Sequence, residues 1–169
     1  MDFKRVSVRG RMAYLLRIFE NMLFFLKCEK EEWSWILEKL WQYTYIEYLD
    51  DWMYEIAEYM PVSVMEDNMN DIEYISKNEL KKLKILYANS PREVNEMLII
   101  LYELGTIDLY SKLQDGSPNT LIKLREGIDI AMKMGVKLPD ESEFEKYRYT
   151  DGNGWGEPFD GREISLYLS

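Results

Sequence analysis

The chain has 169 residues, of which 47% are hydrophobic and 14% aromatic, so it is long enough and apolar enough to form one ordinary domain with a buried core. It contains no histidine and a single cysteine, Cys28, which excludes a Ser/His/Asp triad, a Cys/His nucleophile pair, a His-ligated metal and an intramolecular disulfide. The 21 basic and 31 acidic residues give a net charge of −10, which opposes binding to phosphate backbones and anionic membrane surfaces, so we expect no nucleic acid and no membrane among its partners.

Basic residues near the N-terminus precede an apolar stretch at residues 12–26. Arg17, Glu20 and Asn21 interrupt this stretch, and no small-residue cleavage site follows, so it matches neither a signal peptide nor a membrane span. We therefore expect a cytoplasmic protein, which the single cysteine supports. At helical spacing, residues 12–28 are apolar on nearly every side, which predicts a central and mostly buried helix.

The acidic charge is concentrated in residues 29–79, where 14 acidic and 3 basic residues give a net charge of −11. Within this stretch, residues 31–44 place most apolar side chains on one broad helical face and Glu38 on the opposite one. Trp35 lies on the polar side with Glu38. An indole in that position either packs under a neighbouring segment or is available to a partner.

Residues 46–60 form the next predicted helix, which Pro61 is expected to end. Glu47, Asp51, Glu55 and Glu58 form an acidic row on this helix, apart from its apolar row. Tyr48, Trp52 and Tyr59 lie between the two rows. Carboxylates four residues apart repel each other by a few tenths of a kcal/mol, so the row does not serve the helix itself.

Such a surface is either a solvated helix face or a binding surface for a basic protein, because acids steer association and aromatic side chains supply contact area. We predict the second. The predicted partner-binding residues are Trp35, Glu38, Glu47, Tyr48, Asp51, Trp52, Glu55, Glu58 and Tyr59.

Further helices are predicted downstream. Two capping boxes, Ser76 with Glu79 and Ser90 with Glu93, mark helix starts. The first helix should run to about residue 88 and the second to residue 104, where Gly105 should stop it.

A last long helix should open at Ser117-Pro118 and close at Gly135, and shorter helical pieces are expected at residues 65–75 and 107–113. The pattern predicts an all-α fold, a bundle of five to seven amphipathic helices. We expect residues 1–139 to form the helical domain and residues 140–169 to form an irregular C-terminal segment docked on it.

The C-terminal segment contains the glycine-rich sequence of residues 151–161. No buried strand precedes it, so it is not a dinucleotide-binding loop, and Trp155 and Arg162 stand where a calcium loop needs oxygen ligands. We expect no cofactor and no metal. Residues 163–168 alternate in hydrophobicity and could form a short hairpin with residues 145–149.

The acidic, aromatic helices around Trp33, Trp41 and Asp50-Asp51-Trp52, together with the ending Gly-Asn-Gly-Trp-Gly-Glu-Pro-Phe-Asp-Gly, resemble an immunity protein of a bacterial polymorphic toxin or contact-dependent inhibition system. The resemblance covers most of the chain. It implies a small, non-enzymatic cytosolic protein that binds and neutralises a cognate toxin domain, often a nuclease. It assigns no individual residue to a site.

Two alternatives remain open. One is a metal-dependent hydrolase whose ligands would come from Asp50, Asp51, Glu55 and Glu58; without histidine, its ligands would all be oxygens, which suit magnesium or calcium. The other is a non-catalytic helical adaptor, which shares every feature described above. A divalent-ion titration followed by thermal melting separates the hydrolase from the inhibitor, and only a partner separates the adaptor.

Overall fold

The computed structural model describes residues 1–66 and 72–169, and this part of the chain is helical without a named strand. The all-α prediction is therefore confirmed. The α-helices are α1 (Val8–Phe25), α2 (Lys30–Trp41), α3 (Leu49–Ala57), α4 (Pro61–Met65), α5 (Lys77–Asn89), α6 (Arg92–Thr106) and α7 (Pro118–Met134). Short 3-10 helices are η1 (Phe3–Arg5), η2 (Gln42–Thr44), η4 (Glu141–Phe144), η5 (Asp151–Gly154) and η6 (Gly161–Ile164).

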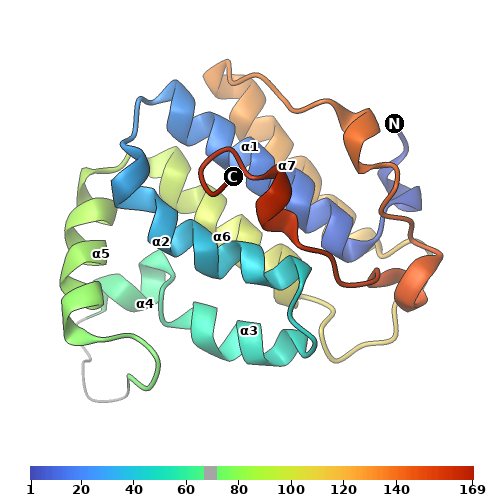
Figure 1. The fold of residues 1–169 in the computed structure, drawn as a ribbon, viewed down its shortest axis with the longest axis horizontal. Helices are drawn as coiled ribbons and strands as arrows, with labels where there is room; N and C mark the ends of the chain where they lie inside the picture. The colour runs from blue at the N-terminus through green and yellow to red at the C-terminus, as the bar shows by residue number, and fades with distance from the viewer. Residues whose placement is uncertain (67–71) are drawn as a thin grey trace.

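Helix α1 is the central element of the fold. Figure 1 shows it in the middle of the molecule, with α6 and α7 behind it and α2 and the C-terminal segment in front, and α1 contacts α2, α6 and α7. Nearly all its side chains are buried, as the sequence predicts. It begins at Val8, before the apolar stretch, because the side chain of Ser7 caps it by accepting a hydrogen bond from the Gly10 amide at 3.1 Å.

Two arginines of α1 are buried and donate hydrogen bonds to loops that pack on the helix. Arg9 donates to the carbonyls of Tyr43 at 2.5 Å and Ile46 at 2.9 Å. Arg11 donates to several acceptors: the Phe3 carbonyl at 3.0 Å, the Ser117 carbonyl at 3.1 Å and the Thr120 hydroxyl at 2.7 Å. Burial lowers the pKa of both guanidiniums, that of Arg11 to about 10, so both remain charged at neutral pH. Backbone carbonyls thus replace the water that these charges lose on burial.

The predicted C-terminal hairpin is wrong. Residues 145–149 pair instead with the N-terminal segment: the Ser7 amide donates to the Tyr147 carbonyl at 2.8 Å, and the Tyr149 amide to the Arg5 carbonyl at 2.7 Å. Residues 161–164 form η6, because the Asp160 side chain caps this turn by accepting from the Arg162 amide at 3.1 Å. The alternation of residues 163–168 therefore reflects a turn packed on α1 and not a strand.

The last residues of the C-terminal segment are held by a buried carboxylate of α1. Glu20 accepts hydrogen bonds from the Trp41 indole at 2.8 Å, from the Ser165 hydroxyl and from the Leu166 amide at 2.7 Å. Arg17 donates to the Ile164 carbonyl at 3.0 Å. Residues 164–166 of the C-terminal segment are thus bonded directly to side chains of α1.

Several helix boundaries differ from the prediction. Gly105 lies inside α6, which ends at Thr106. The glycine serves close packing and not the end of the helix, because a Cβ there would lie 2.9 Å from atoms of Met12, Tyr43 and Trp52. The second capping box does not form, since Ser90 donates to the Leu86 carbonyl and Pro91 occupies the N-cap position.

Of the remaining predicted helix boundaries, some are confirmed by the structure and others are wrong. The capping box of Ser76 and Glu79 and the left-handed Gly135 (φ 80°) that closes α7 are confirmed. Pro61 begins α4 as well as following α3. Residues 107–113 are not helical: residues 107–110 form turns, and irregular structure follows. Of the helical piece predicted at residues 65–75, residues 67–71 lie outside the described residues, Met65 is the last residue of α4, and residues 72–75 are not helical, so the prediction is wrong where it can be compared.

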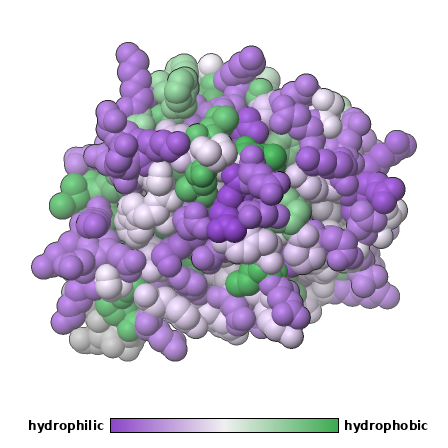
Figure 2. All heavy atoms as spheres, viewed as in Figure 1, coloured by the Kyte–Doolittle hydropathy of each residue, from purple (hydrophilic) through white to green (hydrophobic). Residues whose placement is uncertain are grey.

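The outer surface is mainly hydrophilic, with separate hydrophobic patches, on the face that Figure 2 shows. None of the helices in the described ranges combines the length and the apolar character needed to cross a bilayer.

Candidate partner-binding surface

Helix α3 carries most of the predicted partner-binding residues. It lies at the lower edge of the molecule in Figure 1 and packs on α6 and η2. Tyr48 is its N-cap residue, and Asp50 and Asp51 lie in its first turn, where negative charge is favourable because it opposes the partial positive charge of the helix N-terminus. Trp52 and Ile56 are its buried residues, so the opposite side of this short helix faces solvent.

Two of the predicted aromatic contacts belong to the core, and the prediction that they contact a partner is wrong. Trp52 is 1% exposed, and its indole donates to the Lys39 carbonyl at 3.1 Å. Tyr59 is also 1% exposed, and its hydroxyl donates to the Glu79 carboxylate at 3.1 Å. Trp52 belongs to the buried face of α3, whereas Tyr59 lies after the end of the helix, where its ring packs inside the fold.

Two of the predicted acids are bonded inside the fold. Glu55 forms an ion pair with Lys39, with 2.7 Å between the carboxylate oxygen and Nζ. Glu58 accepts hydrogen bonds from three successive backbone amides, those of residues 73 and 74 at 2.6 Å and of residue 75 at 2.9 Å. These contacts position α3 against α2 and against the chain before α5. Glu55 and Glu58 therefore have structural partners, and the predicted four-acid row is reduced to Glu47 and Asp51.

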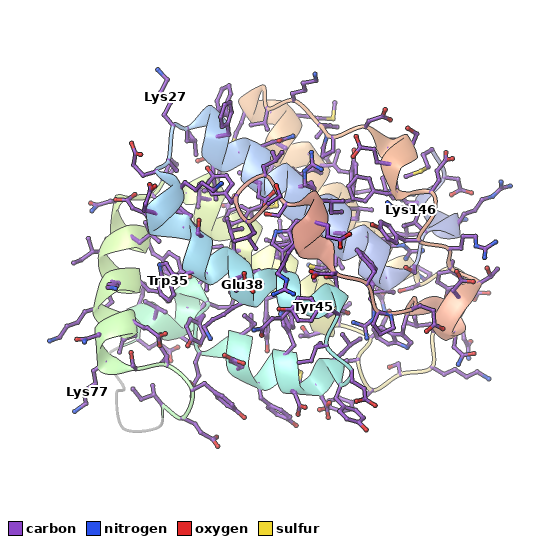
Figure 3. All side chains as sticks on the ribbon, in the orientation of Figure 1. Lys27, Trp35, Glu38, Tyr45, Lys77 and Lys146 are labelled. Atoms are coloured by element: carbon purple, nitrogen blue, oxygen red, sulfur yellow. The ribbon has the colours of Figure 1, made fainter. Side chains whose placement is uncertain are left out.

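The two predicted residues of α2 also face other parts of the fold. Trp35 is half-buried, donates to the Glu32 carbonyl at 2.9 Å and meets the edge of the Tyr59 ring at 6.3 Å between centroids. Glu38 pairs with Arg162 of the C-terminal segment at 3.2 Å. In Figure 3, Trp35 lies toward α5 and Glu38 near the middle of α2. Neither side chain is fully exposed to solvent.

The predicted residues that are exposed form one surface around α3 together with further residues. We call it the acidic tyrosine surface. It consists of Glu47, Tyr48, Asp50, Asp51, Tyr54, Tyr74 and Tyr110. Its tyrosines are 45–73% exposed. Among the described residues, no basic group forms an ion pair with Glu47, Asp50 or Asp51.

The contacts of the tyrosines show that the tyrosines and carboxylates of this surface lie close together. The Tyr54 and Tyr110 hydroxyls are 3.1 Å apart. This hydrogen bond, with smaller contributions from burial and from the charges of Tyr54 and Asp50, raises the pKa of Tyr110 to about 12. The pKa of Tyr74 is raised by Glu73, then by burial and by the carboxylates of Asp51, Glu55 and Glu58. The surface is therefore negative and aromatic at once.

The predicted partner-binding residues do not include Tyr54, Tyr74 and Tyr110, and the sequence suggested Asp50 only as a metal ligand. Asp50 and Tyr54 belong to the same predicted helix, so its periodicity could have placed them near the acidic row. Tyr110 lies in the turns after α6, and the packing of α3 on α6 brings it beside α3. No spacing along the chain indicates that approach.

The described ranges contain no group of three or more Cys, Asp or Glu side chains arranged to hold a metal ion. Of the four carboxylates considered as ligands, Glu55 is paired with Lys39 and Glu58 with backbone amides. Comparisons with models of known protein families, with curated proteins and with solved structures give no match.

Proposed function

We propose that this protein is an immunity protein that binds a basic toxin domain through the acidic tyrosine surface and neutralises it in the cytoplasm of the producing cell. The proposal depends on one observation: three carboxylates that form no ion pair within the described part of the chain lie among four exposed tyrosines, on one short helix and the segments beside it. The sequence resemblance to immunity proteins adds the class of partner. The same surface would bind a non-toxic basic protein if the chain were an adaptor.

The residues of this surface have two roles in the proposal. Glu47, Asp50 and Asp51 steer a cationic partner into contact, so they act mainly on the association rate. Tyr48, Tyr54, Tyr74 and Tyr110 provide the contact area, and each would contribute about 2–4 kcal/mol if it becomes fully desolvated at the centre of the interface. These tyrosines replace Trp52 and Tyr59, which are buried.

The proposal is tested by expressing each reading frame that neighbours this gene, alone and together with this chain, and measuring growth. We expect one product to be toxic and basic, and this chain to restore growth and to co-purify with it in a defined ratio. The result that contradicts the proposal is a set of neighbours that are all harmless, or a toxic one that this chain neither binds nor neutralises. Binding without any toxicity would favour the adaptor.

The hydrolase alternative has a separate test. Thermal melting with and without magnesium and calcium should give the same midpoint, because an inhibitor without a metal site gains nothing from the ion. A midpoint that rises with ion concentration would favour the hydrolase, since a ligand that binds the folded state stabilises it.

A further inference from the structure

The end of α1 and the C-terminal turn enclose an apolar hollow at one corner of the molecule. Its volume is about 1070 Å³, and its walls include Cys28 and Tyr167. Three apolar side chains of the wall are exposed to solvent: Phe24 by 76%, Phe25 by 51% and Leu166 by 45%. Figure 2 shows hydrophobic atoms on this side of the molecule, over the end of α1 and the C-terminal turn of Figure 1. We call this site the lysine-rimmed hollow, because three lysines also line it: Lys27, Lys30 and Lys137.

Local structure keeps the phenylalanines at the surface. Lys27 adopts a left-handed conformation (φ 58°) and reverses the chain immediately after α1. The Lys27 amide donates to the Phe24 carbonyl at 3.0 Å and the Cys28 amide to the Leu23 carbonyl at 2.9 Å, which fixes the reversal. Neither Phe24 nor Phe25 belongs to the buried core, and contiguous exposed apolar groups of this kind mark interaction sites.

The charge that lines the hollow is positive, in contrast to that of the whole chain. The lysines come from three segments: the turn after α1, the first residue of α2 and the chain after α7. Against these three positive charges, the lining contains one carboxylate, that of Glu29. None of the three lysines forms an ion pair with another described residue. Figure 3 shows Lys27 pointing away from the molecule at the turn after α1.

Charge and shape together select the occupant. The lysines attract a negative group, and the apolar wall favours an apolar chain, since both lose unfavourable contacts with water or gain an opposite charge. Hollows of roughly 300–1,000 Å³ that are lined by apolar side chains and a few polar groups hold whole small molecules. We propose that the lysine-rimmed hollow binds a single-chain amphiphile with an anionic head group, of the class of long-chain fatty acids. The alkyl chain lies against the phenylalanines and Leu166, and the carboxylate lies among the lysines.

The sign of the head group is the sharpest part of this proposal. The net charge of −10 attracts cations to the protein as a whole, so non-specific binding would favour a cationic amphiphile over an anionic one with the same alkyl chain. A preference for the anion can therefore come only from a local site of positive charge. The inference does not depend on the proposed function, and α3 lies at the opposite edge of the molecule from the end of α1 in Figure 1.

The test is calorimetric titration of the full chain with dodecanoate and with dodecyltrimethylammonium, each at concentrations at which it is monomeric. We expect dodecanoate to bind with a stoichiometry of one and at least about 10-fold more tightly than the cation. Octanoate should bind about 10-fold or more weakly than dodecanoate, because it lacks four methylene groups that the apolar wall would bury. Absence of dodecanoate binding, or equal or tighter binding of the cation, would overturn the proposal.

Two double variants separate the roles of charge and apolar surface. Lys27→Glu with Lys137→Glu should abolish the preference for dodecanoate. The matched control is Lys81→Glu with Lys112→Glu, which changes the net charge equally at exposed positions away from the hollow and should keep the preference. Phe24→Ser with Phe25→Ser should lose the binding of dodecanoate. Thermal melting checks that all variants are folded. Dodecanoate binding that is unchanged in both double variants of the hollow would contradict the assignment.

The single cysteine of the chain reports whether the ligand occupies this hollow. Burial, and then the charge of Glu32, raise the pKa of the Cys28 thiol, so its alkylation by iodoacetamide is compared at one fixed pH. We expect dodecanoate to slow this alkylation in the unchanged protein and not in the phenylalanine double variant. Binding without protection of Cys28 would place the ligand elsewhere. Sedimentation with phosphatidylglycerol vesicles, without binding of monomeric dodecanoate, would identify a membrane-binding corner and reject the single-ligand site.

Discussion

Helices α1 and α3 both carry charged side chains, but those of α1 are buried and those of the outer face of α3 meet solvent. Arg11 and Glu20 of α1 are 0% exposed, and every contact described above joins them to a different segment of the chain. Glu47, just before α3, and Asp51, in its first turn, are exposed, and neither has an ion pair among the described residues. Groups of the first kind hold the fold together through their hydrogen bonds and are inaccessible to a partner. Charges of the second kind contribute little to stability, so we expect their effect on binding.

We expect the largest change in stability from replacing Arg11. Arg11→Met removes the donor for carbonyls of η1 and of the segment before α7, and leaves these buried acceptors unpaired. We expect the free energy of unfolding to fall by about 3–5 kcal/mol in denaturant titration. Arg125→Met, a control at an exposed position of α7, should change it by less than about 0.5 kcal/mol. Similar losses in both variants would contradict the structural role of Arg11.

The next effect concerns the pH dependence of stability at Glu20. Burial raises the pKa of this carboxyl, against the opposing hydrogen bonds from Ser165, Leu166 and Trp41. The folded protein therefore binds the proton more tightly than the unfolded chain does, so protonation stabilises the fold. As the pH falls from neutral through the raised pKa, Glu20 should add stability, and the gain should be complete below the unfolded value of about 4.3.

The measurement is the difference in unfolding free energy between the unchanged protein and Glu20→Gln from pH 7 to pH 4. The difference should shift in favour of the unchanged protein as the pH falls, by about 1.4 kcal/mol for each pH unit that separates the two pKa values. Other carboxyl groups titrate alike in both proteins and cancel. A shift in the opposite direction would mean that the three hydrogen-bond donors outweigh burial.

The smallest effect compares two acids of the predicted row. Glu58→Gln replaces a charged acceptor of three backbone amides with a neutral one, and we expect a loss of about 1–2 kcal/mol in stability. Glu47→Gln should change stability by less than about 0.5 kcal/mol, because Glu47 is exposed and has no partner among the described residues. Equal stability of the two variants in denaturant titration would remove the distinction between them.

The fold class could be predicted from the sequence because helical periodicity and capping residues are local. The box at Ser76 and Glu79 and the closing Gly135 are examples, since each depends only on neighbours within one turn. The hairpin prediction failed because Asp160 caps a turn and Glu20 holds the chain after it, and the second contact spans more than 140 residues.

The binding surface could be predicted only in part for the same reason. Periodicity separates an apolar row from an acidic one, but it does not give the width of the buried surface, so it cannot show that Trp52 and Tyr59, predicted between the two rows, are buried. It also cannot show that Glu55 meets Lys39 of another helix or that Tyr110 lies beside Tyr54. These contacts depend on how α3 packs against α2 and α6.

The central claim is that the acids around α3 attract a cationic macromolecule. Its most direct test is the association rate of the double variant Glu47→Lys with Asp51→Lys and the toxic product identified by growth rescue, measured at low and high salt. The control is Asp129→Lys with Glu145→Lys, which changes the net charge equally at exposed positions of α7 and of the C-terminal segment. We predict that the first pair slows association by about 10-fold or more at low salt, and that the control has a much smaller effect. Equal rates for the two double variants at low salt would contradict the account.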